Sequence, residues 1–172
     1  MSTLTYSWFM EARTLHAPLD ALSAANRPQG IEIATLTTFD IPALAALTLE
    51  AYDDDVTPEA LLETSEELRL TFEGAFGATT EDSFIGAWDG GTLVGAILVV
   101  RESPWDDAPD GPFVVDLIVA PDYRRRGIAT ALVSEVATRC SQWGFDTLTL
   151  RLDTRHAGAR ELYSVLGFEE IA

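Results

Sequence analysis

The pattern of apolar and polar positions predicts strands and helices in a fixed order along the first half of the chain. The run IEIATL, which begins at residue 31, alternates as a half-buried strand does. Two helices are predicted next, one after Asp40, a plausible N-cap, and one after Thr57, a second N-cap that a proline follows. Two apolar runs then flank an Asp-Gly-Gly turn at residues 89–91, which predicts a β-hairpin.

The second half continues with strands that alternate with helices. FVVDLIV, residues 113–119, is a buried strand with a single aspartate in it. A helix is predicted over residues 127–143, a strand over TLTLRLDT, a helix over residues 156–166 and a last strand that begins with FEEI. The order β-α-α-β-β-β-α-β-α-β predicts an α/β domain with a mixed sheet.

Length and composition limit the class of protein. A chain of 172 residues suits one domain, and we divide it into an N-terminal extension, residues 1–30, and a main domain, residues 31–172. No apolar run reaches the roughly 18 residues of a membrane span, and the N-terminus lacks the basic region of a secretory signal. Cys140 is the single cysteine, so we expect a buried thiol, no metal site and a cytoplasmic protein without a membrane partner.

The charge of the chain is strongly acidic, with 28 acidic residues against 11 basic ones, all of them arginine, and a net charge of −17. Binding of nucleic acid needs a basic face, so this balance argues against nucleic acid as a partner. The same field attracts cationic substrates, although salt screens it beyond about 10 Å. A large negative charge is explained equally well by solubility, so the charge by itself does not identify a substrate.

The most informative segment is VVDLIVAPDYRRRGIATALVSEV, residues 114–136. A strand ends at Val119, and Arg124-x-x-Gly127-x-Ala129 opens a helix. The first amides of a helix lack internal partners and the helix dipole is positive there, so this end can hold a pyrophosphate that a glycine lets approach closely. The segment has neither the lysine of a Walker loop nor the three glycines of a dinucleotide fingerprint. Taken alone, it is explained equally well by a purely structural turn.

Two stretches resemble the GNAT superfamily of N-acetyltransferases. VAPDYRRRGIA resembles motif A of that family, Arg/Gln-x-x-Gly-x-Gly/Ala after a strand that ends in Val-x-Pro. HAGARELYSVLGF resembles motif B, commonly Asn-x-x-Ala-x-x-Leu-Tyr-x-x-x-Gly-Phe, and its matching positions are Ala159, Leu162, Tyr163, Gly167 and Phe168. The resemblance covers residues 31–171 in outline and 113–168 in detail. It implies a GNAT-type mixed sheet of about six to seven strands flanked by about four helices.

The resemblance also implies acetyl-CoA as a co-substrate. It places the pyrophosphate on the amides that open the helix and the pantetheine arm along the preceding strand. The residues that it assigns to acetyl-CoA are Leu117, Ile118, Val119, Arg124, Arg125, Arg126, Gly127, Ile128, Ala129, Thr130 and His156. Two positions depart from the pattern: Ala129 is an accepted variant of the second glycine, and His156 stands where the family commonly has an Asn that contacts CoA.

The chemistry that the resemblance implies is direct transfer of an acetyl group to a primary amine in a ternary complex. Tyr163 occupies the position of the acid that protonates the CoA thiolate, or it only packs its helix on the sheet. A backbone N–H within residues 117–119 stabilises the oxyanion. Asp116, a carboxylate in an apolar strand, is either the base, acting through water, or a hydrogen-bonded structural residue.

The acceptor that this family implies is a small cationic amine or a protein amine. Loops that line the acceptor cleft in this architecture carry the aspartates of residues 53–55 and 106–107. They also carry Trp105, which either stacks on a cation or anchors its loop. Two other classes stay open: a catalytically silent acyl-CoA-binding regulatory module, and a nucleotide-binding α/β protein, for which the sequence shows no triphosphate or ribose signature.

The two ends of the chain suggest one more strand. GNAT domains usually have a strand after the one that begins with Gly-Phe, whereas this sequence stops four residues after Phe168. Proteins usually cover a bare sheet edge. We hypothesise that the apolar residues 3–10 fill that place, either within the chain or from the partner in a homodimer. The alternative is that both ends are loosely ordered.

Overall fold

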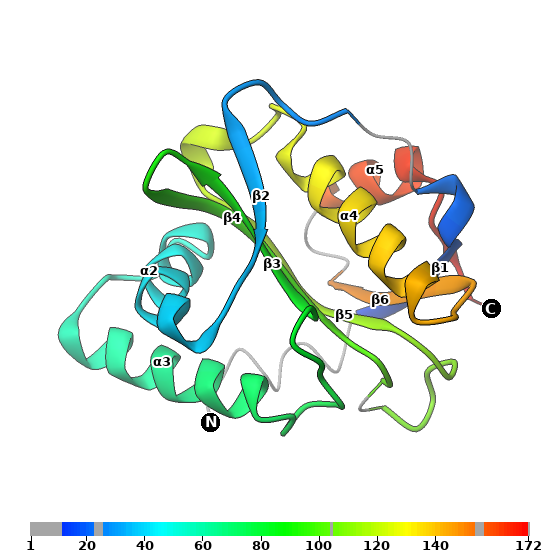
Figure 1. The fold of residues 1–172 in the computed structure, drawn as a ribbon, viewed down its shortest axis with the longest axis horizontal. Coiled ribbons are helices and arrows are strands. Elements are labelled where there is room, and N and C mark those ends of the chain that lie inside the picture. The colour runs from blue at the N-terminus through cyan, green and yellow to red at the C-terminus, as the bar shows by residue number, and fades with distance from the viewer. Residues whose placement is uncertain (1–11, 23–25, 104, 154–156, 172) are drawn as a thin grey trace.

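The chain folds into one mixed sheet with helices on both faces (Figure 1). The computed structural model describes residues 12–22, 26–103, 105–153 and 157–171. The elements are β1 (Ala12–Pro18), β2 (Ile31–Thr35), α2 (Ile41–Ala51), α3 (Pro58–Phe72), β3 (Phe84–Asp89), β4 (Thr92–Val100), β5 (Phe113–Val119), α4 (Ile128–Gln142), β6 (Thr147–Asp153), α5 (Ala157–Leu166) and β7 (Glu169–Glu170).

The seven strands lie in the order β2-β3-β4-β5-β6-β1-β7. Helices α2 and α3 cover one face of the sheet, and α4 and α5 cover the other (Figure 1). This arrangement confirms the mixed sheet with helices on both faces that the sequence predicts. Within the described ranges, no helix has the length and apolar character needed to cross a bilayer.

The helix starts follow local capping chemistry. At the start of α3, the Thr57 hydroxyl accepts a hydrogen bond from the Ala60 amide at 3.1 Å, as predicted. Asp40 is the N-cap residue of α2, as predicted, but its side chain forms no capping hydrogen bond to that helix. Its carboxylate instead accepts from the Thr37 amide at 2.8 Å, because a short 3-10 helix, Thr38–Asp40, comes first and the two side chains close a capping box around it.

The core of the molecule lies between the sheet and the helices on its two faces. From Leu93 to Val100, every residue of β4 is buried, and α4 packs on that strand with a continuous apolar face that includes Leu132. Cys140 lies in the same core, as expected, and desolvation raises the pKa of its thiol to about 12. The thiol therefore stays protonated and serves as a small apolar side chain.

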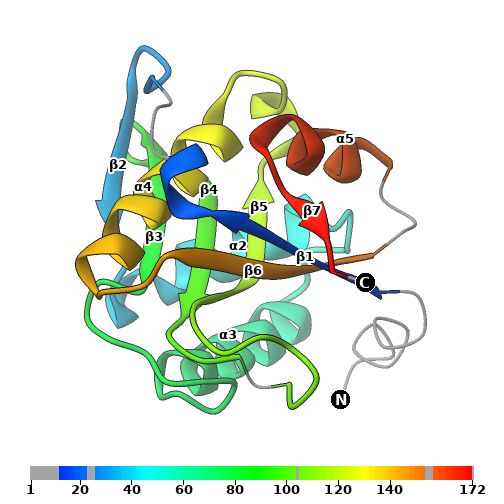
Figure 2. The same cartoon turned by 90° about the vertical axis from the view of Figure 1, so that its right-hand side faces the viewer.

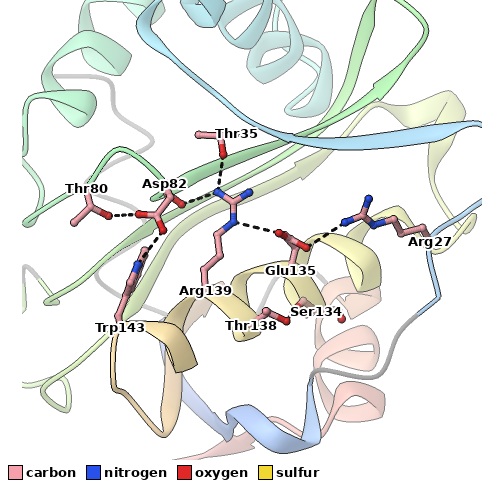
Figure 3. A network of polar contacts seen from close by, with 9 residues as sticks. All are labelled: Arg27, Thr35, Thr80, Asp82, Ser134, Glu135, Thr138, Arg139 and Trp143. Atoms are coloured by element: carbon pink, nitrogen blue, oxygen red, sulfur yellow. Dashed lines mark hydrogen bonds and ion pairs between the residues drawn. The ribbon is translucent and has the colours of Figure 1, made fainter.

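A network of polar contacts holds α4 on the sheet (Figure 3). The Arg139 guanidinium donates to the Thr35 hydroxyl at 2.8 Å and to the Asp82 carbonyl at 2.9 Å. It also donates to the Glu135 carboxylate on its own helix at 3.2 Å. The Trp143 indole donates to the Asp82 carboxylate at 3.1 Å. These contacts reach β2 and the residues just before β3, so they fix the orientation of α4.

Strand β1 comes from the N-terminal segment and lies between β6 and β7, antiparallel to both (Figure 2). It pairs along β6 from Ala12 opposite Asp153 to Pro18 opposite Thr147. A segment near the N-terminus thus lies beside β7 within the chain, but this strand is Ala12–Pro18, whereas the hypothesis named residues 3–10, for which it stays untested. Residues 3–10 lie outside the described residues. The sheet therefore includes part of the segment that we named an extension.

The position of β1 inside the sheet leads to a test of stability. Leu15 is 8% exposed and packs in the core, so Leu15→Ala should lower the free energy of unfolding by about 2–4 kcal/mol. Val165→Ala on α5 is the control, because Val165 is 80% exposed and its loss should change stability by about 0.5 kcal/mol or less. Urea denaturation measures both. Equal, small effects would show that β1 is not an integral strand.

Candidate functional site

The central feature of the candidate site is the divergence of two neighbouring parallel strands, β5 and β6 (Figure 2). They pair only through Phe113 opposite Thr149 and Val114 opposite Leu150. Beyond these pairs, β5 continues along β4 as far as Val119, and β6 continues along β1. The sheet is therefore intact on both outer sides of this point and open between the two strands.

A β-bulge lies where the strands begin to diverge. Val99 of β4 is opposite Val114, but its neighbour Leu98 is opposite Asp116, so Val115 is an extra residue in β5. Bulges bend a strand and increase its local twist, and they often re-aim a side chain next to an active site. The bulge therefore turns the second half of β5 away from β6 and sets the direction of the Asp116 side chain.

Backbone donors of β5 face the divergence. The Ala120 amide donates to the Val94 carbonyl at 2.8 Å, which fixes the alternation of hydrogen bonds between β4 and β5. In an antiparallel pair, every second residue bonds to the partner strand. Ile118 thus bonds to β4, whereas the amides of Leu117 and Val119 point to the other edge, toward β6.

Asp116 and Tyr52 form the shortest contact of the site. The Tyr52 hydroxyl, at the C-terminal end of α2, donates to the Asp116 carboxylate at 2.5 Å. Desolvation raises the pKa of Asp116 to about 6, while the hydrogen bonds from Tyr52 and from the Leu117 amide pull it down. The carboxylate is therefore mostly ionised at neutral pH and still basic enough to accept a proton.

Tyr163 of α5 belongs to the same electrostatic cluster. Its side chain is only 8% exposed, and its ring meets the ring of Phe168 edge to face at a centroid distance of 5.5 Å. Burial raises the pKa of the Tyr163 phenol well above its ordinary value, and the negative charge of Asp116 raises it further. Burial likewise raises the pKa of Tyr52, with added effects from Asp116 and Tyr163. The negative charge of Asp116 thus affects the phenol of Tyr163, the second predicted catalytic residue.

The loop between β5 and α4 has the backbone that motif A implies. It contains a short 3-10 helix, Pro121–Tyr123, and then two residues with positive φ, Arg125 at 62° and Gly127 at 82°. Gly127 is the N-cap of α4. A Cβ at this position would meet only Pro28, at 3.8 Å, so conformation, rather than space, calls for glycine. The free amides of the first turn of α4 follow directly.

Arg124 of this loop contacts protein carbonyls. Its guanidinium donates to the carbonyl of Ala51, the last residue of α2, at 2.7 Å and to the carbonyl of Val119, the last residue of β5, at 3.2 Å. A cation at the C-terminus of a helix also interacts favourably with the helix dipole. Arg124 therefore joins the loop, α2 and β5 in one rigid unit.

The next two arginines have different surroundings. Arg126 lies over the Tyr123 ring at 5.0 Å, and the Tyr123 hydroxyl donates at 2.6 Å to the carboxylate of Asp89, the last residue of β3. Arg125 is exposed and forms no hydrogen bond or ion pair with any residue in the described ranges. Of the three arginines, Arg125 is the one whose charge no protein group in those ranges contacts.

The remaining predicted cofactor residues differ in what they expose. The side chain of Ile128 is buried in the core, whereas Ala129 and Thr130 are half-buried. At this position Ile128 presents only its backbone to a ligand. His156 lies outside the described residues.

The predicted acceptor residues lie on two loops, one after α2 and one between β4 and β5. Residues 53–55 are exposed directly after Tyr52. In the β4–β5 loop, Asp107 forms an ion pair with Arg151 of β6, and the same guanidinium lies 4.9 Å from the centre of the Trp105 ring. That loop encloses a hollow of about 460 Å³ at the start of β5, with no contribution from Asp116 or Tyr163. Trp105 and Asp107 thus attach the loop to β6.

Sequence reasoning missed Tyr52. Its partner Asp116 is 64 residues away, and the contact joins a helix on one face to a central strand. The only local signal was an aromatic residue at the end of a predicted helix, followed by three aspartates. In the described ranges, no group of three or more His, Cys, Asp or Glu side chains could hold a metal ion.

Solved structures with the same fold include several acetyltransferases. A GCN5-related N-acetyltransferase from Sphaerobacter thermophilus matches 94% of this chain with a TM-score of 0.68 and 23% identity, and the match covers 48% of that protein, so this chain spans about half its length. The ribosomal-protein-S18-alanine N-acetyltransferase from Escherichia coli matches 83% of this chain and 79% of its own, with a TM-score of 0.61 and 21% identity.

A third structure, AAC(6')-Iy in complex with the bisubstrate analogue CoA-S-monomethyl-acetylneamine, matches 83% of this chain and 92% of its own, with a TM-score of 0.62 and 18% identity. Among curated proteins, the sequence has no match. The model of the acetyltransferase (GNAT) family matches residues 44–168, which include the diverging strands, the arginine loop and Tyr163. This chain therefore belongs to the GNAT acetyltransferase family.

Proposed function

We propose that this protein is an acetyl-CoA-dependent N-acetyltransferase that moves an acetyl group to a primary amine by direct attack in a ternary complex. One observation carries the proposal. Asp116, with a pKa of about 6, lies in β5 at its divergence from β6, and its charge raises the pKa of the buried phenol of Tyr163; the amides of Leu117 and Val119 face the same opening, and that of Leu117 also bonds to the Asp116 carboxylate. A base, an acid and oxyanion donors are the groups that acyl transfer to an amine requires.

The protein offers groups of matching chemistry to the pyrophosphate and to the pantetheine arm of acetyl-CoA. The pyrophosphate fits the amides from Arg125 to Thr130 at the positive end of α4, with the exposed Arg125 side chain beside it. The pantetheine amides fit the inner edge of β5, where Leu117 and Val119 offer donors. Ile118 has its amide on β4, and Arg124 has its guanidinium on two carbonyls, so their roles in binding are indirect.

The reaction balances with the groups present. The cationic acceptor first loses one proton to solvent, and the neutral amine nitrogen then attacks the thioester carbon, whose carbonyl oxygen, now negative, accepts from the amide of Leu117 or Val119. The amine loses a proton to the Asp116 carboxylate, the carbon–sulfur bond breaks, and the Tyr163 hydroxyl gives its proton to the departing thiolate. Protonated Asp116 then loses its proton to solvent, and the Tyr163 phenolate takes one up from solvent. The net result moves one proton from the amine to the thiol.

The acceptor on this proposal is a small cationic amine or a protein amine in the cytoplasm. The net charge of −17 and the exposed aspartates of residues 53–55, next to Tyr52, favour a positively charged approach. Proteins of the same fold represent both classes of acceptor. One is named for an alanine of a ribosomal protein, and another was solved with a bisubstrate analogue of CoA and acetylneamine. We also propose that the protein pairs with a second copy of itself as a homodimer, and that neither nucleic acid nor a membrane is a binding partner.

The assignment of the arginine loop to the pyrophosphate is tested by Gly127→Glu. A carboxylate at the start of α4 repels the phosphates, so calorimetry should show an affinity for acetyl-CoA at least about a hundredfold lower. Gly127→Ala is the matched control, because it imposes the same positive φ without charge. It should stay within about tenfold of the wild type. Wild-type affinity in Gly127→Glu would contradict the assignment.

The enzymatic proposal is tested by thiol release from acetyl-CoA with a broad panel of amines. The wild type should release CoA with at least one amine, and Tyr163→Phe should lower kcat by about a hundredfold while the affinity for acetyl-CoA is kept. The phenol ring stays in place in this variant, so only the proton is lost. Binding of acetyl-CoA without release on any amine would instead identify a silent acyl-CoA-binding module.

A further inference from the structure

The end of α2 brings Tyr52 to Asp116 from the opposite side to Tyr163. Tyr52 follows the last residue of α2, and its amide closes the helix by donating to the Thr48 carbonyl at 3.1 Å. Its side chain is 37% exposed, yet its hydroxyl reaches the carboxylate of Asp116. Tyr52 therefore lies between the solvent-exposed loop of residues 53–55 and the diverging strands.

The backbone at Tyr52 is held in place by the arginine loop. Arg124 bonds to the carbonyl of Ala51, the residue before Tyr52, and to the carbonyl of Val119, three residues after Asp116. The α2 helix and β5 are thus joined twice, by Arg124 and by the contact between Tyr52 and Asp116. Because the two links attach within a few residues of each other on both elements, the hydroxyl of Tyr52 has little freedom to leave the carboxylate.

From this arrangement we infer that Tyr52 is the positioning residue of Asp116: its hydroxyl fixes the carboxylate at the mouth of the diverging strands, where the acceptor amine delivers its proton. The inference rests on the proposed function, in which Asp116 is the base. Tyr52 acts through Asp116 and needs no contact with the acceptor. Tyr52 is exposed and directly precedes the acidic loop of residues 53–55. On the proposed function, a cationic amine would pass this loop on its way to Asp116.

The groups that face Asp116 set its titration. Tyr52 approaches from α2 and Tyr163 from α5, and both are neutral at physiological pH because burial raises each phenol's pKa. The guanidinium of Arg124 donates to the carbonyls of Val119 and Ala51, and that of Arg151 on β6 forms an ion pair with Asp107. Tyr52 is thus the side chain that donates a hydrogen bond to the ionised carboxylate.

The test is Tyr52→Phe, read first without any activity. Carbon-13 NMR of the Asp116 carboxyl, identified by its loss in Asp116→Asn, should show a midpoint near 6 in the wild type. In Tyr52→Phe the midpoint should rise by about one to two pH units, because the lost bond favoured the charged form. Tyr123→Phe removes a similar hydroxyl contact, to Asp89, and should leave the midpoint unchanged. An unchanged midpoint in Tyr52→Phe would overturn the inference.

The activity of the same variants separates this inference from the proposed function. The acid limb of kcat/KM against pH should move upward in Tyr52→Phe by the same amount as the carboxyl midpoint, because only the ionised carboxylate accepts the proton. In the Asp116→Asn background, Tyr52→Phe should add less than about a twofold further loss. Additive losses would contradict action through Asp116. If Asp116→Asn alone kept full activity, the proposed base would be wrong, whatever Tyr52 does.

Discussion

The end of the parallel pairing between β5 and β6, after Val114 and Leu150, is the constraint on which the rest of the structure depends. Strands that stop pairing leave backbone donors and acceptors without partners, which is costly in a folded interior. Here the cost is confined to the inner edges, because β4 and β1 continue the sheet on the outer sides. The open edges are thus available to a ligand with amide groups, which supplies the missing partners.

Several contacts outside the strands keep this opening in a fixed form. The Arg139 network fixes α4, whose first turn carries the free amides, against β2 and the start of β3 (Figure 3). Arg124 ties the same loop to α2 and β5. Strand β1 closes the far side of β6 with residues from the other end of the chain. Binding groups on rigid elements lose little freedom when a ligand arrives, which favours both affinity and catalysis.

Much of the fold could be predicted because its signals are local. The alternation of apolar and polar residues predicted β2, and the Asp-Gly-Gly turn predicted the hairpin of β3 and β4. Gly144 and Gly167 follow the ends of α4 and α5. Strand β1 was not foreseen because residues 12–18, ARTLHAP, carry a weak pattern, and only pairing with β6 and β7 makes them a strand. Asp40 was expected correctly at the start of α2, but the short 3-10 helix that engages its side chain left no local signal.

The candidate site divides in the same way. Asp116 was visible as a charge in an apolar strand, and Tyr163 as part of a motif, since both signals lie within short stretches. The bulge at Val115, the contact with Tyr52 and the use of Arg124 as a brace depend on register and on elements far apart in the chain. No local pattern carries that information, so they needed the structure.

The central claim is that acetyl-CoA pairs with the inner edge of β5. Amide hydrogen exchange, followed by NMR with and without acetyl-CoA, tests it at single residues. The account predicts that acetyl-CoA slows exchange most at Val119, whose amide faces the divergence, and changes Ile118 least, because its amide already bonds to β4. Leu117, whose amide already bonds to the Asp116 carboxylate, should lie between them. Equal protection of all three amides, or unchanged exchange at Val119 when acetyl-CoA is bound, would contradict it.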